Sequence, residues 1–264
     1  MSLLFRKRVY QEPKYRLMKY ILLLLFILPL QLTARLNQVE VYTYHNMPPY
    51  VIDLEQKSGL YFEFVDLLNQ MNSGYQFKLV YMPRKRIDHR LKQNKLNGVV
   101  IGVNPKWFRD PTQSRYHWTP KMMSDQDIFV SLSKHPVIVN ELSDLESKRV
   151  GGIHGFKYVG VDSLANQQKL TRVNTQSETQ LFDMLKKERI DTAILSYYTF
   201  LYLSKRDHND FYIAEKHHDT FTRHIMLPKS QNNSLYLTLN SILICEDFTK
   251  HWKQRLLNYT MPVH

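Results

Sequence analysis

The stretch YQFKLVYMPRKRIDHRLKQNKLNGVVI, residues 75–101, contains the pattern that decides the fold. Tyr75 to Met82 alternates apolar and polar residues, as a strand with one buried face does. Ile87 to Gln93 is a short basic helical segment, and Val99 to Ile101 is a compact apolar strand. Strand, helix and strand in this order form a β-α-β unit, which indicates a parallel sheet.

The same alternation continues on both sides of this stretch. Upstream, residues 39–43 are rich in β-branched residues, as strands are, and residues 62–71 have their apolar side chains at helical spacing. Downstream, residues 149–153 and 192–195 indicate strands, and residues 177–188 between them indicate a helix. The sequence therefore predicts an α/β fold with two lobes, each a mostly parallel sheet flanked by helices.

Three further segments complete the expected architecture. Residues 127–133 and 222–228 read as extended chain between the two lobes, and residues 233–259 as a long helical region. Ligands of mostly parallel sheets collect at the carboxyl ends of the strands, so the loops directly after each strand are the ones expected to bind a ligand.

The N-terminal region has the pattern of an export signal. Lys19 precedes an apolar run of 13 residues, 20–32, and Thr33-Ala34 follows it. A transmembrane helix needs about 20 residues, and Pro29 interrupts this run, so cleavage after Ala34 is the interpretation and an uncleaved anchor the alternative. Met1 or Met18 could be the start.

Cysteine content and charge narrow the class of protein further. Cys245 is the only cysteine, which excludes an internal disulfide and a lipid-modified cysteine at the cleavage site. A soluble periplasmic protein is therefore expected. Without the first 34 residues, which hold six Lys/Arg and one Glu, the net charge falls from +12 to +7. We interpret this excess as spread along the chain, with no dense Lys/Arg block, and expect no nucleic-acid partner.

Motifs for metal or cofactor chemistry are missing. His217, His218, Asp219 and His224 are close in sequence, but their spacing matches no zinc signature. The sequence has no Gly-rich phosphate loop, no G-x-S-x-G turn and no H-E-x-x-H helix. We expect neither a metal nor a cofactor.

A series of landmarks resembles a known family in both order and spacing. They are Pro48-Pro49-Tyr50, Gly59, Asp66-Leu67, Leu91 to Val103, Trp118-Thr119-Pro120, Leu142 to Gly155, and Arg189-Ile-Asp-Thr-Ala193. Together they resemble the type II periplasmic solute-binding proteins, specifically family 3, which includes the polar amino-acid receptors of ABC transporters. The resemblance covers nearly all of the chain after residue 34.

This resemblance implies a Venus-flytrap arrangement, in which two hinge strands join the lobes and a small ligand is enclosed between them. The expected divisions are a signal peptide at 1–34, the first part of lobe 1 at 35–127, lobe 2 at 128–228, and C-terminal helices returning to lobe 1 at 229–264. It further implies a monomeric receptor, not an enzyme, that delivers its solute to an ABC permease. Two alternatives stay open: a sensor protein, and a dehydratase-like enzyme that would use carboxylates such as Asp125 and Glu178.

In lobe 1, the resemblance and the loops after strands indicate six ligand-binding residues. Arg109 corresponds to the arginine with which the family grips a carboxylate, and Arg84 to a residue that stacks on the ligand. The other four could wall the pocket or offer polar tips: Tyr44, Tyr50, Asn104 and Trp107.

In lobe 2, four more positions follow strands or begin helices: His154, Phe156, Ser177 and Tyr197. Phe156 stands where the family has a hydroxyl, and the acidic residue that takes the ligand amine in the family is missing after Leu195. We therefore expect a small polar, carboxylate-bearing solute, and an acidic or neutral ligand rather than a cationic one.

Overall fold

The computed structural model describes residues 37–71, 74–231 and 233–260. Residues 36–264 form one compact unit, and the expected export signal lies outside the described residues. Within the described ranges, no helix combines the length and the apolar character that crossing a membrane requires.

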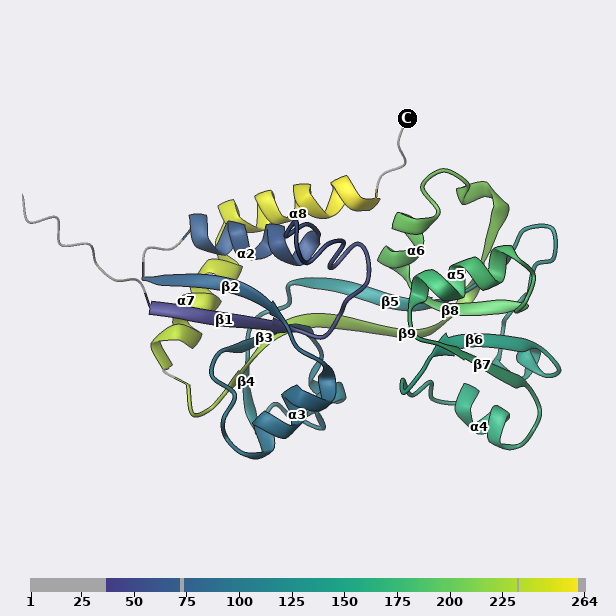
Figure 1. Ribbon diagram of the computed structural model, residues 1–264, viewed down its shortest axis with the longest axis horizontal. Helices are drawn as coiled ribbons and strands as arrows, with labels where there is room; N and C mark the ends of the chain where they lie inside the picture. Colours follow the sequence, from purple (N-terminus) through teal and green to yellow (C-terminus); the bar gives the residue numbers. More distant parts are fainter. Residues whose placement is uncertain (1–36, 72–73, 232, 261–264) are drawn as a thin grey trace, which may run out of the picture. The chain divides into compact units, whose positions relative to one another are not determined.

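The strands follow the chain in an α/β order (Figure 1). They are β1 (Asn37–Thr43), β2 (Tyr75–Tyr81), β3 (Val99–Val103), β4 (Tyr116–Trp118), β5 (Met123–Leu132), β6 (Arg149–Ile153), β7 (Thr171–Thr175), β8 (Thr192–Ser196) and β9 (Phe211–Pro228).

Helices alternate with these strands and close the chain. The α-helices are α2 (Leu60–Gln70), α3 (Arg84–Lys92), α4 (Val161–Asn166), α5 (Glu178–Lys186), α6 (Tyr197–Leu203), α7 (Asn233–Ile244) and α8 (Glu246–Thr260). Short 3-10 turns are η1 (Pro105–Phe108), η2 (Leu142–Leu145) and η3 (His208–Asp210).

One sheet runs through the described residues in the order β2-β1-β3-β9-β5-β8-β6-β7, with β4 pairing on β9. The β1 strand is parallel to β2 and β3, and β6 is parallel to β7 and β8. Between these two parallel groups lie β5 and β9, which are antiparallel to each other and to their neighbours β8 and β3. Two antiparallel strands therefore connect two parallel α/β halves (Figure 1).

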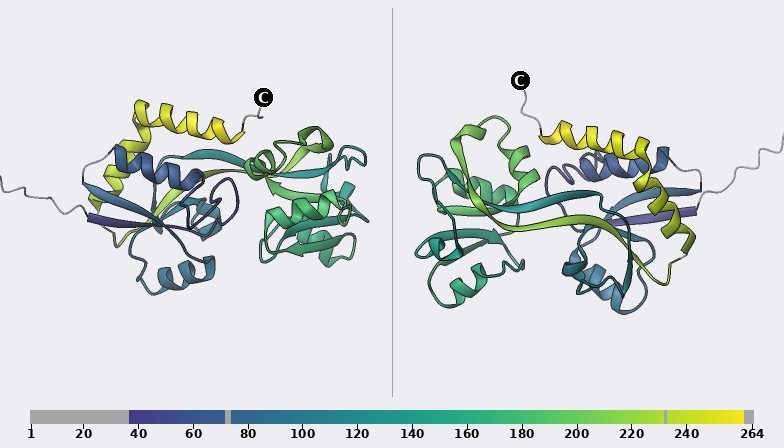
Figure 2. Two further views of the ribbon diagram at one scale, coloured as in Figure 1. Left: turned by 45° about the horizontal axis from the view of Figure 1, so that its top comes forward. Right: turned by 180° about the vertical axis from the view of Figure 1, so that it is seen from behind.

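The hydrophobic core follows the same division. Two clusters pack on opposite faces of the β1-β2-β3 group, one with α2, α7 and α8 and the other with Ile87 of α3. Accordingly, α3 lies across the sheet from α2 and α8 (Figure 2). Two more clusters cover the two faces of the β5-β6-β8 group, one of them with α5 and α6.

The loop before α2 is held against that helix by a glycine. Gly59 has φ 123°, and a Cβ there would lie 2.8 Å from the carbonyl oxygen of Tyr50. The backbone N–H groups of Leu60 and Tyr61 donate to the carbonyls of Pro49 and Tyr50, at 2.8 and 2.9 Å. This close approach buries Tyr50 completely and fixes where its hydroxyl points.

The predicted α/β alternation is confirmed, and three short elements were missed. The elements β4, α4 and β7 were not predicted from the sequence. With three, six and five residues, they are too short to show a clear hydrophobic period. The two segments expected to be extended belong to longer strands: residues 127–132 are the C-terminal part of β5, and residues 222–228 are the C-terminal part of β9.

Candidate functional site

A buried ion pair lies on the antiparallel strands β5 and β9, which run between the two halves. Arg223 of β9 is 2% exposed, and its Nη2 and Nε lie 2.7 and 2.8 Å from Oδ2 of Asp125 in β5. The Asp125 side chain is fully out of contact with solvent. Two charges removed from water this completely are stable only when they neutralise each other and their remaining polar atoms are bonded.

The alternation of β9 explains why an arginine is buried here. Phe221, Arg223 and Ile225 are buried in turn along the strand, so they lie on one face. The free end of the guanidinium, Nη1, donates to the carbonyl of Gly102 at 3.0 Å. The rings of Tyr50, Trp107 and Phe221 lie within 4.5 to 5.4 Å of the guanidinium carbon. Arg223 is thus surrounded by aromatic rings and bonded to the Asp125 carboxylate.

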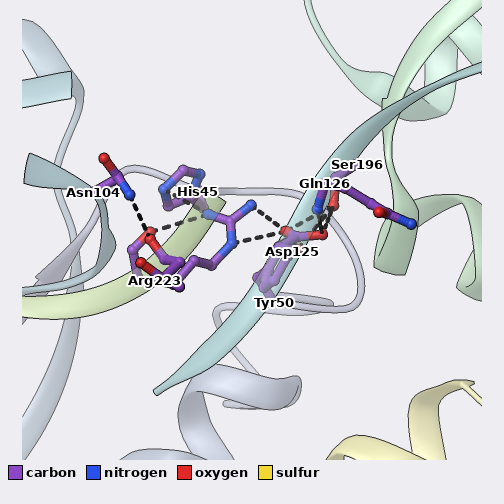
Figure 3. A network of polar contacts seen from close by, with 9 residues as sticks. His45, Tyr50, Asn104, Asp125, Gln126, Ser196 and Arg223 are labelled. Carbon is purple, nitrogen blue, oxygen red and sulfur yellow. Dashed lines mark hydrogen bonds and ion pairs between the residues drawn. The ribbon is translucent and has the colours of Figure 1, made fainter. Parts of the chain in front are cut away.

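His45 contacts Arg223 on the side of β1. Its Nε2 lies 3.3 Å from Nη1 of Arg223 (Figure 3). Burial and then the positive charge of Arg223 hold the pKa of His45 well below its usual value. The imidazole is therefore neutral at pH 7 and accepts a hydrogen bond from the arginine.

Tyr50 carries the network from β5 to the end of β8. Its hydroxyl donates to Oδ2 of Asp125 and lies 2.8 Å from Oγ of Ser196, the last residue of β8 (Figure 3). Ser196 Oγ also donates to Asp125, at 3.2 Å. Burial raises the pKa of Tyr50 well above its ordinary value, so the phenol stays protonated. One carboxylate therefore connects residues from both parallel halves of the sheet.

Asn104 and Trp107 attach the loop after β3 to the same place. Asn104 Nδ2 donates to the carbonyl of Thr222 at 2.8 Å, and its Oδ1 accepts from the backbone N–H of Lys106. This second bond caps η1 and fixes Trp107, whose ring meets Phe221 edge-on at 4.9 Å. The loop is thereby fixed to β9.

Carboxyl groups outnumber cations on this face. Asp127 is two residues along β5 from Asp125, opposite Ser196 of β8 and Asp219 of β9, so the four side chains share one side of the sheet. Burial, and then the charges of Glu178 and Asp125, raise the pKa of Asp127 to about 8.

Glu178 adds a further carboxyl at the first residue of α5, and it is 5% exposed. Its pKa is raised to about 7, mainly by burial, with the nearby hydroxyl of Thr199 acting in the opposite direction. In this environment a hydrogen-bond donor or a cation would be stabilised, whereas a bare anion would not.

Five of the residues predicted in lobe 1 lie together. Tyr50, Asn104 and Trp107 are in the network, and Tyr44 packs against His45 with ring centroids 4.2 Å apart and the rings tilted by 35°. Arg84 adjoins them: it donates to Tyr44 Oη at 3.2 Å and to the carbonyl of Trp107 at 2.5 Å. Its guanidinium also lies 3.9 Å from the centre of the Phe108 ring, so it is engaged in packing.

Arg109 lies apart from this group. It follows η1 in the left-handed conformation with φ 54°, and its side chain is exposed. Among the described residues, no hydrogen bond or ion pair links the Arg109 side chain to the buried network. The loop thus places Trp107, not Arg109, against the network.

The four predicted residues of the second half lie at strand ends and helix starts. His154 and Phe156 are exposed directly after β6. Ser177 caps α5, since its Oγ accepts from the backbone N–H of Gln180 at 3.2 Å. Tyr197, half-buried, is the first residue of α6. No contact between described residues joins these four side chains into one site.

Arg223, the centre of the network, was not among the predicted site residues. Its signal was available, because a charged residue at an inward position of the alternating segment Phe221 to Ile225 must find a buried partner. Identifying Asp125 as that partner requires the pairing of β5 with β9. Within the described ranges, no cluster of three or more His, Cys, Asp or Glu side chains could hold a metal ion.

Comparison with known proteins shows the fold. No protein-family model and no curated protein matches the chain. Several solved structures do match the chain. A mutant of ArgBP from T. maritima has a TM-score of 0.66 at 17% identity, covering 84% of this chain and 95% of that one. The fold is that of the two-lobed type II periplasmic binding proteins.

Two further structures agree. The GluR0 ligand-binding core in complex with L-glutamate has a TM-score of 0.66 at 13% identity, covering 87% of this chain and all of that one. A periplasmic binding protein of Salmonella typhimurium with high arginine specificity has a TM-score of 0.63 at 17% identity, with coverages of 85% and 100%. The descriptions of the last two name an amino acid, L-glutamate for the GluR0 core and arginine for the Salmonella protein.

Proposed function

We propose that this chain is a periplasmic solute-binding protein of family 3, which encloses a small polar, amino-acid-like solute between two lobes and delivers it to an ABC importer. One observation carries the proposal: two long antiparallel strands connect two parallel α/β halves, and a buried network centred on Asp125 joins residues from both halves along these two strands. An arrangement of this kind suits a hinge.

Within this proposal, lobe 1 consists of residues 35–127 and 229–264, and lobe 2 of residues 128–228. The solute lies near the ends of β1, β3, β6 and β8, where the predicted site residues are found. Carboxyl groups of Asp127 and Glu178 would receive its amine, in place of the acid that the family has after its corresponding strand. Arg109, the exposed arginine of the η1 loop, would bind its carboxylate.

The cellular context belongs to the same proposal. An export signal at 1–34 sends the chain to the periplasm, where it acts as a monomer without a lipid anchor. Its partner would be the permease of an ABC importer in the inner membrane. No cofactor takes part, and the solute leaves chemically unchanged.

A thermal-shift screen tests the function directly. Purified chain is heated with each member of a library of L-amino acids and small organic acids. A ligand at 100 times its dissociation constant stabilises the folded state by about 2.7 kcal/mol, a clear rise in melting temperature. The absence of any shift across the library would contradict the proposal.

The same screen tests the role of Arg109. Arg109→Ala should abolish the shift produced by a carboxylate-bearing hit, while the melting temperature without ligand stays nearly unchanged because the side chain is exposed. Lys106→Ala is the matched control, an exposed cation in the same loop. Equal shifts in both variants would remove Arg109 from the site.

The alternative with structural support is an enzyme on the same fold. Glu178 and Asp127 have pKa values of about 7 and 8, in the range that suits a general acid or base at neutral pH. Incubating each thermal-shift hit with the protein and analysing the mixture by mass spectrometry separates the two functions. A receptor returns the compound unchanged, whereas conversion that is lost in Glu178→Gln would establish the enzyme.

A further inference from the structure

The net positive charge of residues 36–264 is concentrated in one short segment, contrary to the expectation of an even spread. Residues 36–264 contain 29 Lys/Arg and 23 Asp/Glu, a net charge of +6. Residues 84–95 alone contain six Lys/Arg and one Asp, a net charge of +5. The rest of residues 36–264 is therefore almost neutral, and the excess charge belongs to α3 and the turn after it.

Four cations of this segment are available to a partner. Lys85, Arg86, Lys92 and Lys95 are all exposed, and none forms an ion pair or side-chain hydrogen bond with another described residue. We call these four residues the α3 basic surface. The single acid of the segment, Asp88, is already paired with Arg84 at 2.9 Å.

Helix geometry places two of these cations on the outer side of α3, and Lys95 lies in the turn after the helix. Ile87 is fully buried and anchors the helix to the sheet. Lys85 and Lys92 are seven residues apart, so they lie on one side of the helix and about 10 Å apart along its axis. This helix is on the sheet face opposite α2 and α8 (Figure 2).

The chemistry of the surface favours a partner with many diffuse negative charges. None of the large apolar side chains exposed in the described structure belongs to residues 84–95. A stable protein–protein interface has an apolar core depleted of charged residues, and the α3 basic surface has no such apolar core. Three of its four cations are lysines, which act as point charges rather than as the planar forks that recognise one carboxylate or phosphate.

We propose that the α3 basic surface docks this protein electrostatically on an anionic phospholipid bilayer. A cluster of exposed Lys/Arg is attracted to the surface of membranes that contain anionic lipids by about 1 kcal/mol per cation near the surface, and the attraction falls off within a Debye length. Without exposed apolar anchors the contact is reversible and does not insert into the bilayer. The inference does not depend on the identity of the solute.

Vesicle co-sedimentation tests this inference on residues 35–264, which include the whole compact unit and its cores. At about 0.05 M salt, where screening is weak, the protein should sediment with vesicles of phosphatidylglycerol and phosphatidylethanolamine but not with phosphatidylcholine vesicles. Raising the salt to about 1 M, where the Debye length is about 3 Å, should release it. Failure to sediment at low salt, or equal binding to both kinds of vesicle, would overturn the proposal.

Paired charge reversals locate the contact. Lys85→Glu/Lys92→Glu should lower the vesicle partition coefficient at least about tenfold, because two attractions become repulsions. Lys250→Glu/Lys253→Glu on α8, with both lysines exposed, makes the same change in net charge and should lower it less than about twofold. Equal losses would show a response to net charge alone and would overturn the assignment to α3. The lipid and salt comparisons on the unchanged chain decide the matter if a variant fails to fold.

Discussion

Two charged regions of this molecule differ in how their charges are solvated. On β5 and β9, Arg223 and Asp125 are almost completely buried, and each is bonded to the other. On α3, Lys85 and Lys92 are exposed and have no ion-pair partner among the described residues. In the first region the charges pair with each other and connect the two halves of the fold, whereas in the second region they remain available to a partner.

The difference follows from solvation. A charge in the interior must be compensated inside the protein, so its neighbours are fixed by the fold and its removal is felt by the whole molecule. A charge in water is compensated by solvent and salt, so it contributes little to stability and remains available. The effects of mutations in the two regions should therefore differ, both in their size and in whether they change stability or binding.

The largest effect is expected from Asp125→Ala, which leaves Arg223 buried without its counter-charge. Loss of one partner of a buried pair costs about 3–5 kcal/mol of unfolding free energy. Urea denaturation measures it, with Glu146→Ala as the control, because the Glu146–Lys169 pair is exposed and should be worth less than about 1 kcal/mol. Similar losses of unfolding free energy in the two variants would show that the buried ion pair stabilises the fold no more than the exposed one does.

The next effect is a dependence of stability on pH. In the folded protein the pKa of Glu178 is about 7, raised from 4.5, so the folded state binds this proton more tightly than the unfolded chain does. The free energy of unfolding should therefore fall as the pH rises from about 4.5 to 7, and Asp127, with a pKa of about 8, extends the fall to about pH 8.

Urea unfolding between pH 5 and 8 checks this sign. Glu178→Gln should reduce the fall by up to about 3 kcal/mol, since one pKa unit corresponds to about 1.36 kcal/mol. Glu188→Gln is the control, because the pKa of that carboxyl is lowered by its hydrogen bond with Lys134. Stability that rises over this range would show that Glu178 and Asp127 are ionised at little cost in the folded protein.

A smaller loss is expected from Tyr50→Phe. The change keeps the ring over Arg223 and removes only the hydroxyl that bonds Asp125 and Ser196. A hydrogen bond to a charged group contributes about 1.5–3 kcal/mol, which sets the expected loss in urea denaturation. Tyr81→Phe, at a partly exposed tyrosine with no hydrogen bond from its hydroxyl to another described residue, should change stability by less than about 0.5 kcal/mol.

The smallest effect on stability is expected from Lys85→Glu/Lys92→Glu on α3. These exposed side chains have no partner to lose among the described residues, so the unfolding free energy should change by no more than about 1 kcal/mol. Thermal unfolding in about 0.1 M salt measures it. A loss comparable to that of Asp125→Ala would remove the contrast between the buried and the exposed region.

Local sequence patterns predicted most of the architecture. The alternation in residues 75–82 and the apolar run at 99–101 are confirmed as β2 and β3, and the extended reading of residues 222–228 is confirmed within β9. Element boundaries differ by a few residues, as at α3, which begins at Arg84 directly after Pro83 rather than at Ile87. The β7 strand, with one buried residue out of five, carries too little hydrophobic pattern to be found.

The candidate site was predicted less completely. Tyr50, Asn104 and Trp107 were predicted because they follow strands that must end at the same edge of a sheet; they lie in the buried network, and their role in binding a ligand stays a prediction. Arg223 was not, because its role depends on a partner 98 residues away, across the β5-β9 pairing. The expectation that the positive charge is evenly spread was also wrong, but this error did not need the structure to be seen. Counting Lys and Arg along residues 84–95 would have shown the cluster.

Sequence by itself determined the order of strands and helices, because hydrophobic periodicity depends only on neighbouring residues. It also determined which segment carries the excess positive charge. Tertiary structure decided which charges are buried: the pairing of β5 with β9 brings Asp125 to Arg223, and the turn at Gly59 brings Tyr50 to both. The reason is that desolvation depends on everything that surrounds a side chain in space, and that is fixed only when distant segments pack together.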